Sequence, residues 1–190
     1  MQKEIKVLVV QALREEYTRT PLPGAHVEHV YTGVGKVNAA FRLAMAIWQT
    51  KPDFVINVGT AGSVSRQVGD IVLCTAFMDR DLCILGDLGV PWKQCTEAGI
   101  QHFPWDWGLP TDGLCNTGDS FVTDAKGMEG DVVDMEAYAE AQVCNELGIP
   151  FLSVKYVTDI VGQNSVKHWE DKLADARRGL SAYFEKIALR

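Results

Sequence analysis

Two acids flank a methionine at Asp134-Met135-Glu136, where a short apolar strand gives way to a helix of small residues. Acids in the first turn of a helix are stabilised by its dipole, so a capping role is one interpretation. Chemistry is the other, because carboxyl groups can donate a proton, accept one or stabilise a developing positive charge. On this stretch alone, both interpretations stay open.

More acids follow predicted strands. A β-branched run over 5–10, of the kind that suits a strand buried on both faces, leads to Glu15 and Glu16. A second apolar run over 151–157 leads to Asp159. In open α/β sheets ligands bind at the carboxyl ends of the strands, so these acids are placed for chemistry. For Glu15 and Glu16, a solvated first helical turn is the alternative.

Two glycine-rich segments, Gly33-Val34-Gly35 and Gly59-Thr60-Ala61-Gly62-Ser63, follow predicted strands that end at Tyr31 and Val58. A Gly-x-Gly turn lets a ligand approach the backbone, although it is a weak signal by itself. Asn38 stands where a dinucleotide-binding fingerprint would have its last glycine, so we exclude an NAD site and expect no cofactor.

The acids of Asp79-Arg80-Asp81 suggest a metal site. Hard cations need more converging oxygens than this segment supplies, so we expect no metal. A charged amphipathic helix is predicted over 165–189, and its apolar face, which includes Trp169 and Phe184, is expected to pack as scaffold.

Composition narrows the functional classes. The 190 residues are 47% hydrophobic, which suits one core and predicts a single domain over 1–190. With 18 basic and 25 acidic residues the net charge is −7, and no basic run could follow a phosphate backbone, so we exclude nucleic acid. Because no segment resembles a secretion signal or a membrane span, and five cysteines lack paired spacing, we expect a cytoplasmic protein with free thiols and no membrane contact.

Four segments carry a family pattern when they are taken in order, namely 32–40, 56–63, 132–141 and 154–159. Together they resemble the nucleoside phosphorylase and nucleosidase superfamily, most specifically the methylthioadenosine/S-adenosylhomocysteine nucleosidases. The resemblance covers nearly the whole chain apart from 89–113. It implies an α/β, three-layer phosphorylase/hydrolase-like fold, in which helices flank a central mixed, largely parallel β-sheet.

The resemblance also implies catalytic roles for three acids. By it, Asp159 protonates or hydrogen-bonds N7 of a purine leaving group, and Glu136 accepts hydrogen bonds from the ribose hydroxyls and offsets the oxocarbenium charge. Glu16 takes a proton from the attacking water, and Glu15 is only its neighbour. Met135 packs on the sugar.

Further substrate contacts are implied for Thr60, Ala61, Gly62, Phe121, Val122 and Thr158. By the resemblance, the first three line the ribose, Phe121 stacks on the purine, and Val122 bonds the base through its backbone. For Phe121, an ordinary core position is the alternative. Thr158 stands where these nucleosidases usually have serine, and it keeps the hydroxyl.

Two positions bear on the reaction. Hexameric purine phosphorylases carry an arginine for phosphate where this chain has Asn57, so a principal countercharge for phosphate is missing. Family members selective for 6-oxopurines tend to carry asparagine in place of Asp159, which therefore points to adenine.

We therefore expect a purine nucleosidase that hydrolyses the N-glycosidic bond of a 5′-substituted adenosine. The substrate would be methylthioadenosine, S-adenosylhomocysteine or a relative such as aminodeoxyfutalosine. A purine nucleoside phosphorylase and a noncatalytic purine-binding protein on the same fold are the alternatives.

The aromatic-rich segment 89–113 departs from the family. It holds Trp92, Trp105 and Trp107 without a clear period, where longer nucleosidases have a helix and a strand. The tryptophans either cap the core or form a lid or subunit contact beside the 5′ substituent. Since family nucleosidases are homodimers, we expect a homodimer with one of these tryptophans at or near the interface.

Overall fold

The computed structural model describes residues 4–162 and 166–190. Its strands are β1 (Ile5–Gln11), β2 (Ala25–Tyr31), β3 (Phe54–Ser63), β4 (Ile71–Asp79), β5 (Lys93–Cys95), β6 (Gly113–Thr117), β7 (Val132–Asp134) and β8 (Phe151–Ile160). Its helices are α1 (Lys36–Thr50), α2 (Glu97–Ile100), α3 (Ala137–Leu147) and α4 (Val166–Ala188), with short 3₁₀ helices η1 (Arg14–Glu16) and η2 (Cys83–Leu88).

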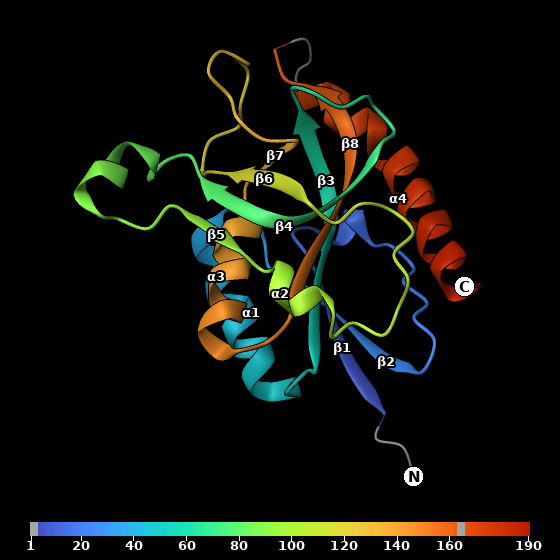
Figure 1. Ribbon diagram of the computed structural model, residues 1–190. Coiled ribbons are helices and arrows are strands. Elements are labelled where there is room, and N and C mark those ends of the chain that lie inside the picture. Colours follow the sequence, from blue (N-terminus) through green and yellow to red (C-terminus); the bar gives the residue numbers. More distant parts are fainter. Residues whose placement is uncertain (1–3, 163–165) are drawn as a thin grey trace.

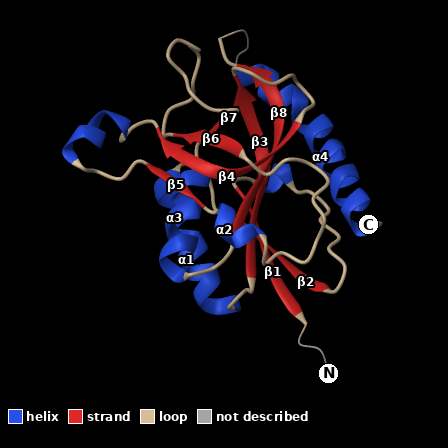
Figure 2. Ribbon diagram, viewed as in Figure 1, coloured by secondary structure: helices blue, strands red, loops and turns tan. Residues whose placement is uncertain are grey.

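The eight strands form one mixed sheet in the order β2-β1-β3-β7-β6-β4-β5, and β8 pairs with both β3 and β4. The pairings β1–β2, β1–β3, β3–β8, β4–β6 and β6–β7 are parallel, whereas β3–β7, β4–β5 and β4–β8 are antiparallel. Helices α1 and α3 lie together on one side of the sheet and α4 lies on the other (Figures 1 and 2). This arrangement confirms the expected three-layer α/β fold with a mixed, largely parallel sheet.

The strand β1 is buried on both faces. Leu8 and Val10 pack in the core on the side of α1 and α3, and Val7 and Val9 pack in the core on the side of α4. The split follows from the alternation of side chains along a strand. All four residues are at most 2% exposed, which confirms the interpretation of the β-branched run over 5–10.

The strand β3 is longer than predicted, because it continues past Val58 through the glycine-rich segment to Ser63. Its neighbour β8 pairs with it from Val55 to Ser63, with a register shift between Ala61 and Gly62. Glycines weaken an isolated strand, but the backbone hydrogen bonds to β8 hold this segment extended. The predicted strand end at Val58 was wrong because its stabilising partner lies far along the chain.

Aromatic side chains from the irregular segment after α2 cover one face of the core. Phe103, Trp105 and Trp107 are 7%, 9% and 6% exposed. The first two pack on Phe54 with ring centroids 4.6 and 5.9 Å away, and the Tyr183 hydroxyl of α4 donates to the Trp107 carbonyl at 2.7 Å. The structure therefore selects the core-capping interpretation for Trp105 and Trp107.

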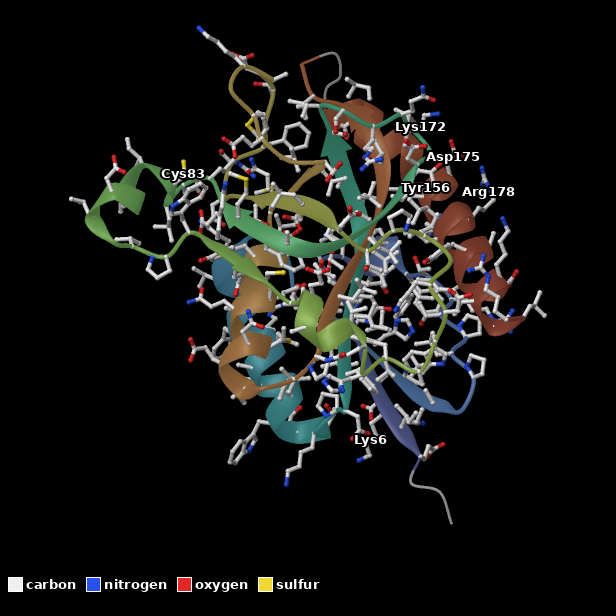
Figure 3. The ribbon with its side chains drawn as sticks, in the orientation of Figure 1. Lys6, Cys83, Tyr156, Lys172, Asp175 and Arg178 are labelled. Atoms are coloured by element: carbon white, nitrogen blue, oxygen red, sulfur yellow. The ribbon has the colours of Figure 1, made fainter. Side chains whose placement is uncertain are left out.

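Helix α4 packs against β8 on this same face. Phe184 is fully buried, and Gly179 lies so close to β8 that a Cβ there would come within 2.5 Å of the Tyr156 ring. Figure 3 shows Tyr156 beside α4. The predicted packing of Trp169 lies outside the residues whose side chains are described. In the described ranges, no helix has the length and apolar character needed to cross a membrane.

Candidate active site

A cavity of about 210 Å³ opens at the carboxyl ends of β1, β3 and β8, beside the point where β7 leads into α3. These three strands run parallel, so their carboxyl ends meet at one edge. The lining residues are Ala12, Leu13, Glu16, Val34, Thr60, Ala61, Gly62, Arg80, Ser120, Phe121, Val122, Val133, Asp134, Met135, Glu136, Asp159 and Val161.

Glu16 ends η1 and lines the cavity with only 6% of its surface exposed. Its Oε1 accepts hydrogen bonds from the Thr60 backbone N–H at 3.2 Å and the Thr60 hydroxyl at 2.7 Å. Its Oε2 accepts one from the Leu13 N–H at 3.2 Å. These donors hold the carboxyl group in one orientation, whereas the neighbouring Glu15 is exposed to solvent. The structure places Glu16, and not Glu15, in the cavity lining.

Asp159 lines the cavity near the end of β8 and is 6% exposed. The Thr158 hydroxyl donates to its Oδ1 at 2.8 Å and also lies 3.3 Å from the Ala61 carbonyl. A Cβ at Gly62 would approach Asp159 Oδ2 to 3.1 Å, so this glycine gives the carboxyl group room. Thr158 does not line the cavity, because it is buried behind Asp159 and orients it.

Glu136 caps the start of α3 and is 7% exposed. Its Oε1 accepts a hydrogen bond from the Gly35 N–H at 2.9 Å, and Gly35 adopts a φ of 93° that favours glycine. Burial raises the pKa of Glu136 to about 7, and Asp134 adds to the rise while Lys155 and the Gly35 N–H oppose it. The charge of this carboxyl group therefore changes near neutral pH.

Asp134 forms a buried ion pair with Lys155, with 2.8 Å between Oδ2 and Nζ. The Thr117 hydroxyl donates to Oδ1 at 2.5 Å, and the Ala137 N–H donates to Oδ2 at 2.9 Å. Burial opposes ionisation of Asp134, yet Lys155 and these donors hold its pKa below the usual value. In turn, Asp134 outweighs burial and raises the pKa of Lys155, so the pair stays charged.

Phe121 lines the cavity and belongs to the segment that follows β6. It is 41% exposed, which excludes the interpretation of Phe121 as an ordinary core residue. Val122 and Ser120 beside it also line the cavity. An exposed aromatic ring at the mouth of a small apolar cavity is available to stack on a flat ligand.

Asp79 and Asp81 bind a lysine. The Lys36 ammonium at the start of α1 lies 2.8 Å from a carboxyl oxygen of each acid. Across residues 4–162 and 166–190, no group of three or more His, Cys, Asp or Glu side chains is arranged to hold a metal. These contacts tie the end of β4 to the start of α1, next to the Gly35 N–H that donates to Glu136.

Asn57 belongs to β3, where it pairs with Ser153 of β8, and it does not line the cavity. It is 2% exposed, and its Oδ1 accepts a hydrogen bond from the Ser153 hydroxyl at 2.7 Å. Its significance for phosphate is therefore one of charge, because a neutral amide here adds no positive potential to the cavity.

The cavity brings together all the residues expected from the sequence except Thr158. The cavity residues that sequence reasoning missed are Ala12, Leu13, Val34, Arg80, Ser120, Val133, Asp134 and Val161. Asp134 and Arg80 belong to the acidic segments Asp134-Met135-Glu136 and Asp79-Arg80-Asp81, so the sequence offered a reason to consider them as site residues. The others are small or apolar, and their residue types carry no signal.

The sequence is similar to those of known proteins. The chain is 32% identical over 186 residues to the 5′-methylthioadenosine/S-adenosylhomocysteine nucleosidase of Geobacillus kaustophilus, and this alignment covers 86% of the chain and 79% of the relative. The model of the family described as Phosphorylase superfamily matches residues 2–101 and 111–188. The chain belongs to the phosphorylase superfamily, in its family of 5′-methylthioadenosine/S-adenosylhomocysteine nucleosidases.

Solved structures of this nucleosidase family share the fold. The enzyme of Neisseria meningitidis in complex with methylthio-immucillin-A has a TM-score of 0.76 and 25% identity, covering 96% of this chain and 97% of that chain. The enzyme of Colwellia psychrerythraea in complex with adenine has a TM-score of 0.77 and 24% identity, covering 97% and 96%. The family match leaves out only 102–110 within its range, a narrower departure than the predicted 89–113.

In this member of the nucleosidase family, one further acid lies close to the cavity. Glu140 follows Glu136 by one turn of α3 and is 0% exposed. The Asn57 side chain interacts with its carboxyl group and opposes the rise of its pKa, and its two oxygens otherwise have no hydrogen-bond partner in the described part of the chain. Burial raises the pKa of Glu140 to about 8 against the opposing charge of Lys155, and Glu136 and Asp134 add to the rise. The buried side chains of α1, which packs on α3, are all apolar.

We expect Glu140→Gln to stabilise the protein increasingly as the pH rises. An unfolded glutamate ionises above about pH 4.5, whereas folded Glu140 keeps its proton up to about pH 8. The folded state binds more protons in this window, so stability falls with rising pH by up to about 1.4 kcal/mol per pH unit. Glutamine carries no such penalty. Thermal unfolding at pH 5 and pH 8 should show a Tm gap between variant and wild type that widens with pH.

Glu146→Gln is the matched control, because Glu146 is exposed on the same helix. It should leave the Tm close to wild type at both pH values. A Tm gap for Glu140→Gln that is the same at pH 5 and pH 8 would contradict the assignment of Glu140 as a buried, protonated acid.

Proposed function

We propose that this protein hydrolyses the N-glycosidic bond of 5′-substituted adenosines and releases adenine and the corresponding ribose derivative. The observation that carries the proposal is the convergence of Glu16, Glu136 and Asp159 on one small cavity in a chain of the nucleosidase family. A noncatalytic purine-binding protein would need an aromatic wall and a donor for the base, but it would have no use for a buried acid held by three donors, as Glu16 is.

In the proposed reaction, Asp159 protonates or hydrogen-bonds N7 while the C1′–N9 bond breaks, and the bonding electrons leave with the base. Glu136 accepts hydrogen bonds from the ribose hydroxyls and offsets the positive charge that develops on C1′ and the ring oxygen. Glu16 takes a proton from water as the water oxygen bonds to C1′. Proton exchange with solvent returns both acids to their starting states.

The charges around the cavity support water rather than phosphate as the nucleophile. Lys155 is committed to Asp134, and the terminal nitrogens of Arg80 donate to backbone carbonyls. A phosphate dianion would thus enter a cavity bordered by Glu16 and Glu136 with its cations already engaged. Phosphorolysis, the enzymatic alternative, lacks the countercharge that it needs.

Adenine is the proposed base, because Asp159 stands where family members selective for 6-oxopurines tend to carry asparagine. The 5′ substituent is proposed to be methylthio or homocysteinyl, as in the names of the relatives, or a related group. All five cysteines are free thiols, which supports the proposed cytoplasmic location.

The first test is hydrolysis itself. Because phosphate has no free countercharge here, we expect adenine release from 5′-methylthioadenosine and S-adenosylhomocysteine in phosphate-free buffer, with a free sugar as coproduct. Chromatography of adenine and of the sugar product measures both. A strict requirement for phosphate, with a sugar 1-phosphate as product, would replace the hydrolase proposal with a phosphorylase.

The second test separates the three acids. Asp159→Asn and Glu16→Gln should each lower kcat by a factor of about 10²–10⁴, the usual contribution of positioned acid–base groups. Glu16→Gln should leave the Kd for a substrate analogue nearly unchanged, since its partner is water. Glu136→Gln should both raise that Kd and lower kcat, because ribose is bound in the ground state and more tightly in the transition state. Wild-type rates in all three variants would favour a noncatalytic protein.

We also propose a homodimer. Of the three tryptophans expected at or near its interface, Trp92 is only part-buried and lies against Gly86 in the segment between β4 and β5. Trp105 and Trp107 are buried within the chain and cannot supply the interface. The solvent side of α1 instead carries the exposed apolar residues Val37 (79%), Phe41 (66%), Met45 (47%) and Trp48 (78%). This spacing places them along one helical stripe, the kind of surface that marks a protein interface.

The segment between β4 and β5 projects from the molecule as an arm (Figure 1). It includes η2 and exposes Ile84 (82%) and Leu88 (78%), and the Lys36–Asp81 ion pair joins its base to α1. Val34, 44% exposed, both lines the cavity and precedes the stripe. A second copy bound here would border the cavity mouth, which supports a shared site.

The dimer is tested by a charged double variant of the stripe, Phe41→Arg with Trp48→Arg. Burying two arginines against apolar side chains is unfavourable, so we expect light scattering to show a mass near 21.0 kDa instead of about twice that value. Leu189→Arg, at an 88% exposed position on the C-terminal end, is the control and should remain dimeric. A wild-type protein that stays monomeric at micromolar concentrations would refute the proposal.

A further inference from the structure

Among the described residues that line the cavity, Arg80 is the one lysine or arginine, and the proposed reaction assigns it no role. It follows β4 within Asp79-Arg80-Asp81, and it makes four hydrogen bonds to backbone carbonyls. Nη1 donates to the carbonyls of Asn116 and Asp134, each at 3.0 Å, and Nη2 donates to those of Gly118 at 3.0 Å and Ser120 at 2.5 Å. One guanidinium thereby joins the end of β6, the end of β7 and the segment that leads to Phe121.

Gly118 makes this arrangement possible. A Cβ added there would lie 2.5 Å from Arg80 Nε and 2.7 Å from Cζ, so the guanidinium lies directly against the glycine backbone. The fit also favours arginine, because the four donors of its two terminal nitrogens, held in one plane, serve four carbonyls, whereas a lysine ammonium has only three donors. The four hydrogens of the two terminal nitrogens are engaged by carbonyl oxygens. Nε is buried and has no hydrogen-bond partner among the described residues.

The acids on either side of Arg80, Asp79 and Asp81, connect the segment 118–120 to the start of α1. Asp81 Oδ2 accepts a hydrogen bond from the Asp119 N–H at 2.8 Å, and Asp119 Oδ1 accepts one from the Lys36 N–H at 2.8 Å. The Lys36 ammonium bonds Asp79 and Asp81. The segment 118–120 is therefore fixed both to α1 and to Arg80, while no regular secondary structure holds 118–131.

We propose that Arg80 is a positioning residue for the purine. By bonding the carbonyls of Asp134, Gly118 and Ser120, it holds the Gly118–Val122 segment in the position in which Phe121 can stack on the base. The inference rests on the proposed function, since it assigns the purine side of that site. Because the Phe121 side chain is 41% exposed, burial alone does not hold it in position. The hydrogen bonds from Arg80 to the carbonyls of Gly118 and Ser120 hold the backbone that leads to it.

Arg80→Met tests the proposal, because methionine keeps much of the stem and removes every guanidinium donor. We expect the KM for 5′-methylthioadenosine and the Kd for adenine to rise about tenfold, while kcat changes less than about threefold, since base binding is lost and the acids remain in place. Calorimetric titration with adenine measures the Kd without turnover. Arg80→Lys should fall between wild type and Arg80→Met.

Gly118→Ala perturbs the same contact without changing Arg80. The added Cβ of the alanine displaces the Arg80 guanidinium, which keeps its positive charge. It should reproduce the rise in KM and Kd. Arg66→Met is the control, since Arg66 pairs with Asp131 outside the cavity, and its KM should stay within about twofold of wild type.

Unchanged KM and adenine Kd in Arg80→Met and Gly118→Ala would overturn the positioning role. A loss of kcat with unchanged adenine Kd would overturn it as well, because Arg80 would then act on the chemistry. If wild type binds adenine but releases none from any nucleoside, the proposed function fails, and the Kd comparison still decides the role of Arg80. Should Arg80→Met not fold, Arg80→Lys and Gly118→Ala carry the same test.

Discussion

A buried ion pair between Asp134 and Lys155 joins the strand β7 to β8 at the floor of the cavity. The Asp134 side chain also accepts the Ala137 N–H, so it sets where α3 begins and hence where Glu136 lies. Its backbone carbonyl accepts hydrogen bonds from Arg80 and from the Gly118 N–H. Removing either partner of such a pair leaves a buried charge without compensation, a large cost in stability. Through its carboxylate and its backbone carbonyl, this one residue positions both the start of α3 with Glu136 and the segment that leads to Phe121.

The cavity concentrates acids where burial makes each of them costly. Glu16, Glu136, Asp134, Asp159 and Glu140 are all at most 7% exposed, and Lys155 is the one buried lysine or arginine of the described residues. Asp134 forms its ion pair with that lysine, and within the described part of the structure Glu136 and Glu140 form none. Burial therefore raises the pKa of Glu136 and of Glu140. Such a cluster reduces the stability of the fold, and sites of this kind persist where they serve chemistry.

The far side of the sheet varies without disturbing this cluster. The segment that the family match leaves out, 102–110, packs its aromatic residues on Phe54 and α4. None of its residues lines the cavity. Because the sheet separates the two faces, the core can be capped by tryptophans in an irregular segment while the strand ends keep their positions. A change on one face therefore carries little consequence for the chemistry proposed on the other.

The sequence by itself determined the strands β1 and β8, the C-terminal helix α4 and the acids that face one cavity. Apolar runs that end in acids suffice for this, since parallel strands bring their carboxyl ends to a single edge. Tertiary structure decided the rest. It extended β3 through Gly62, buried Thr158 behind Asp159, and turned Arg80 toward four carbonyls. It also buried the Glu140 carboxyl group beside the Asn57 side chain. Each of these features depends on a contact between residues far apart in the sequence, and local residue pattern carries no record of such contacts.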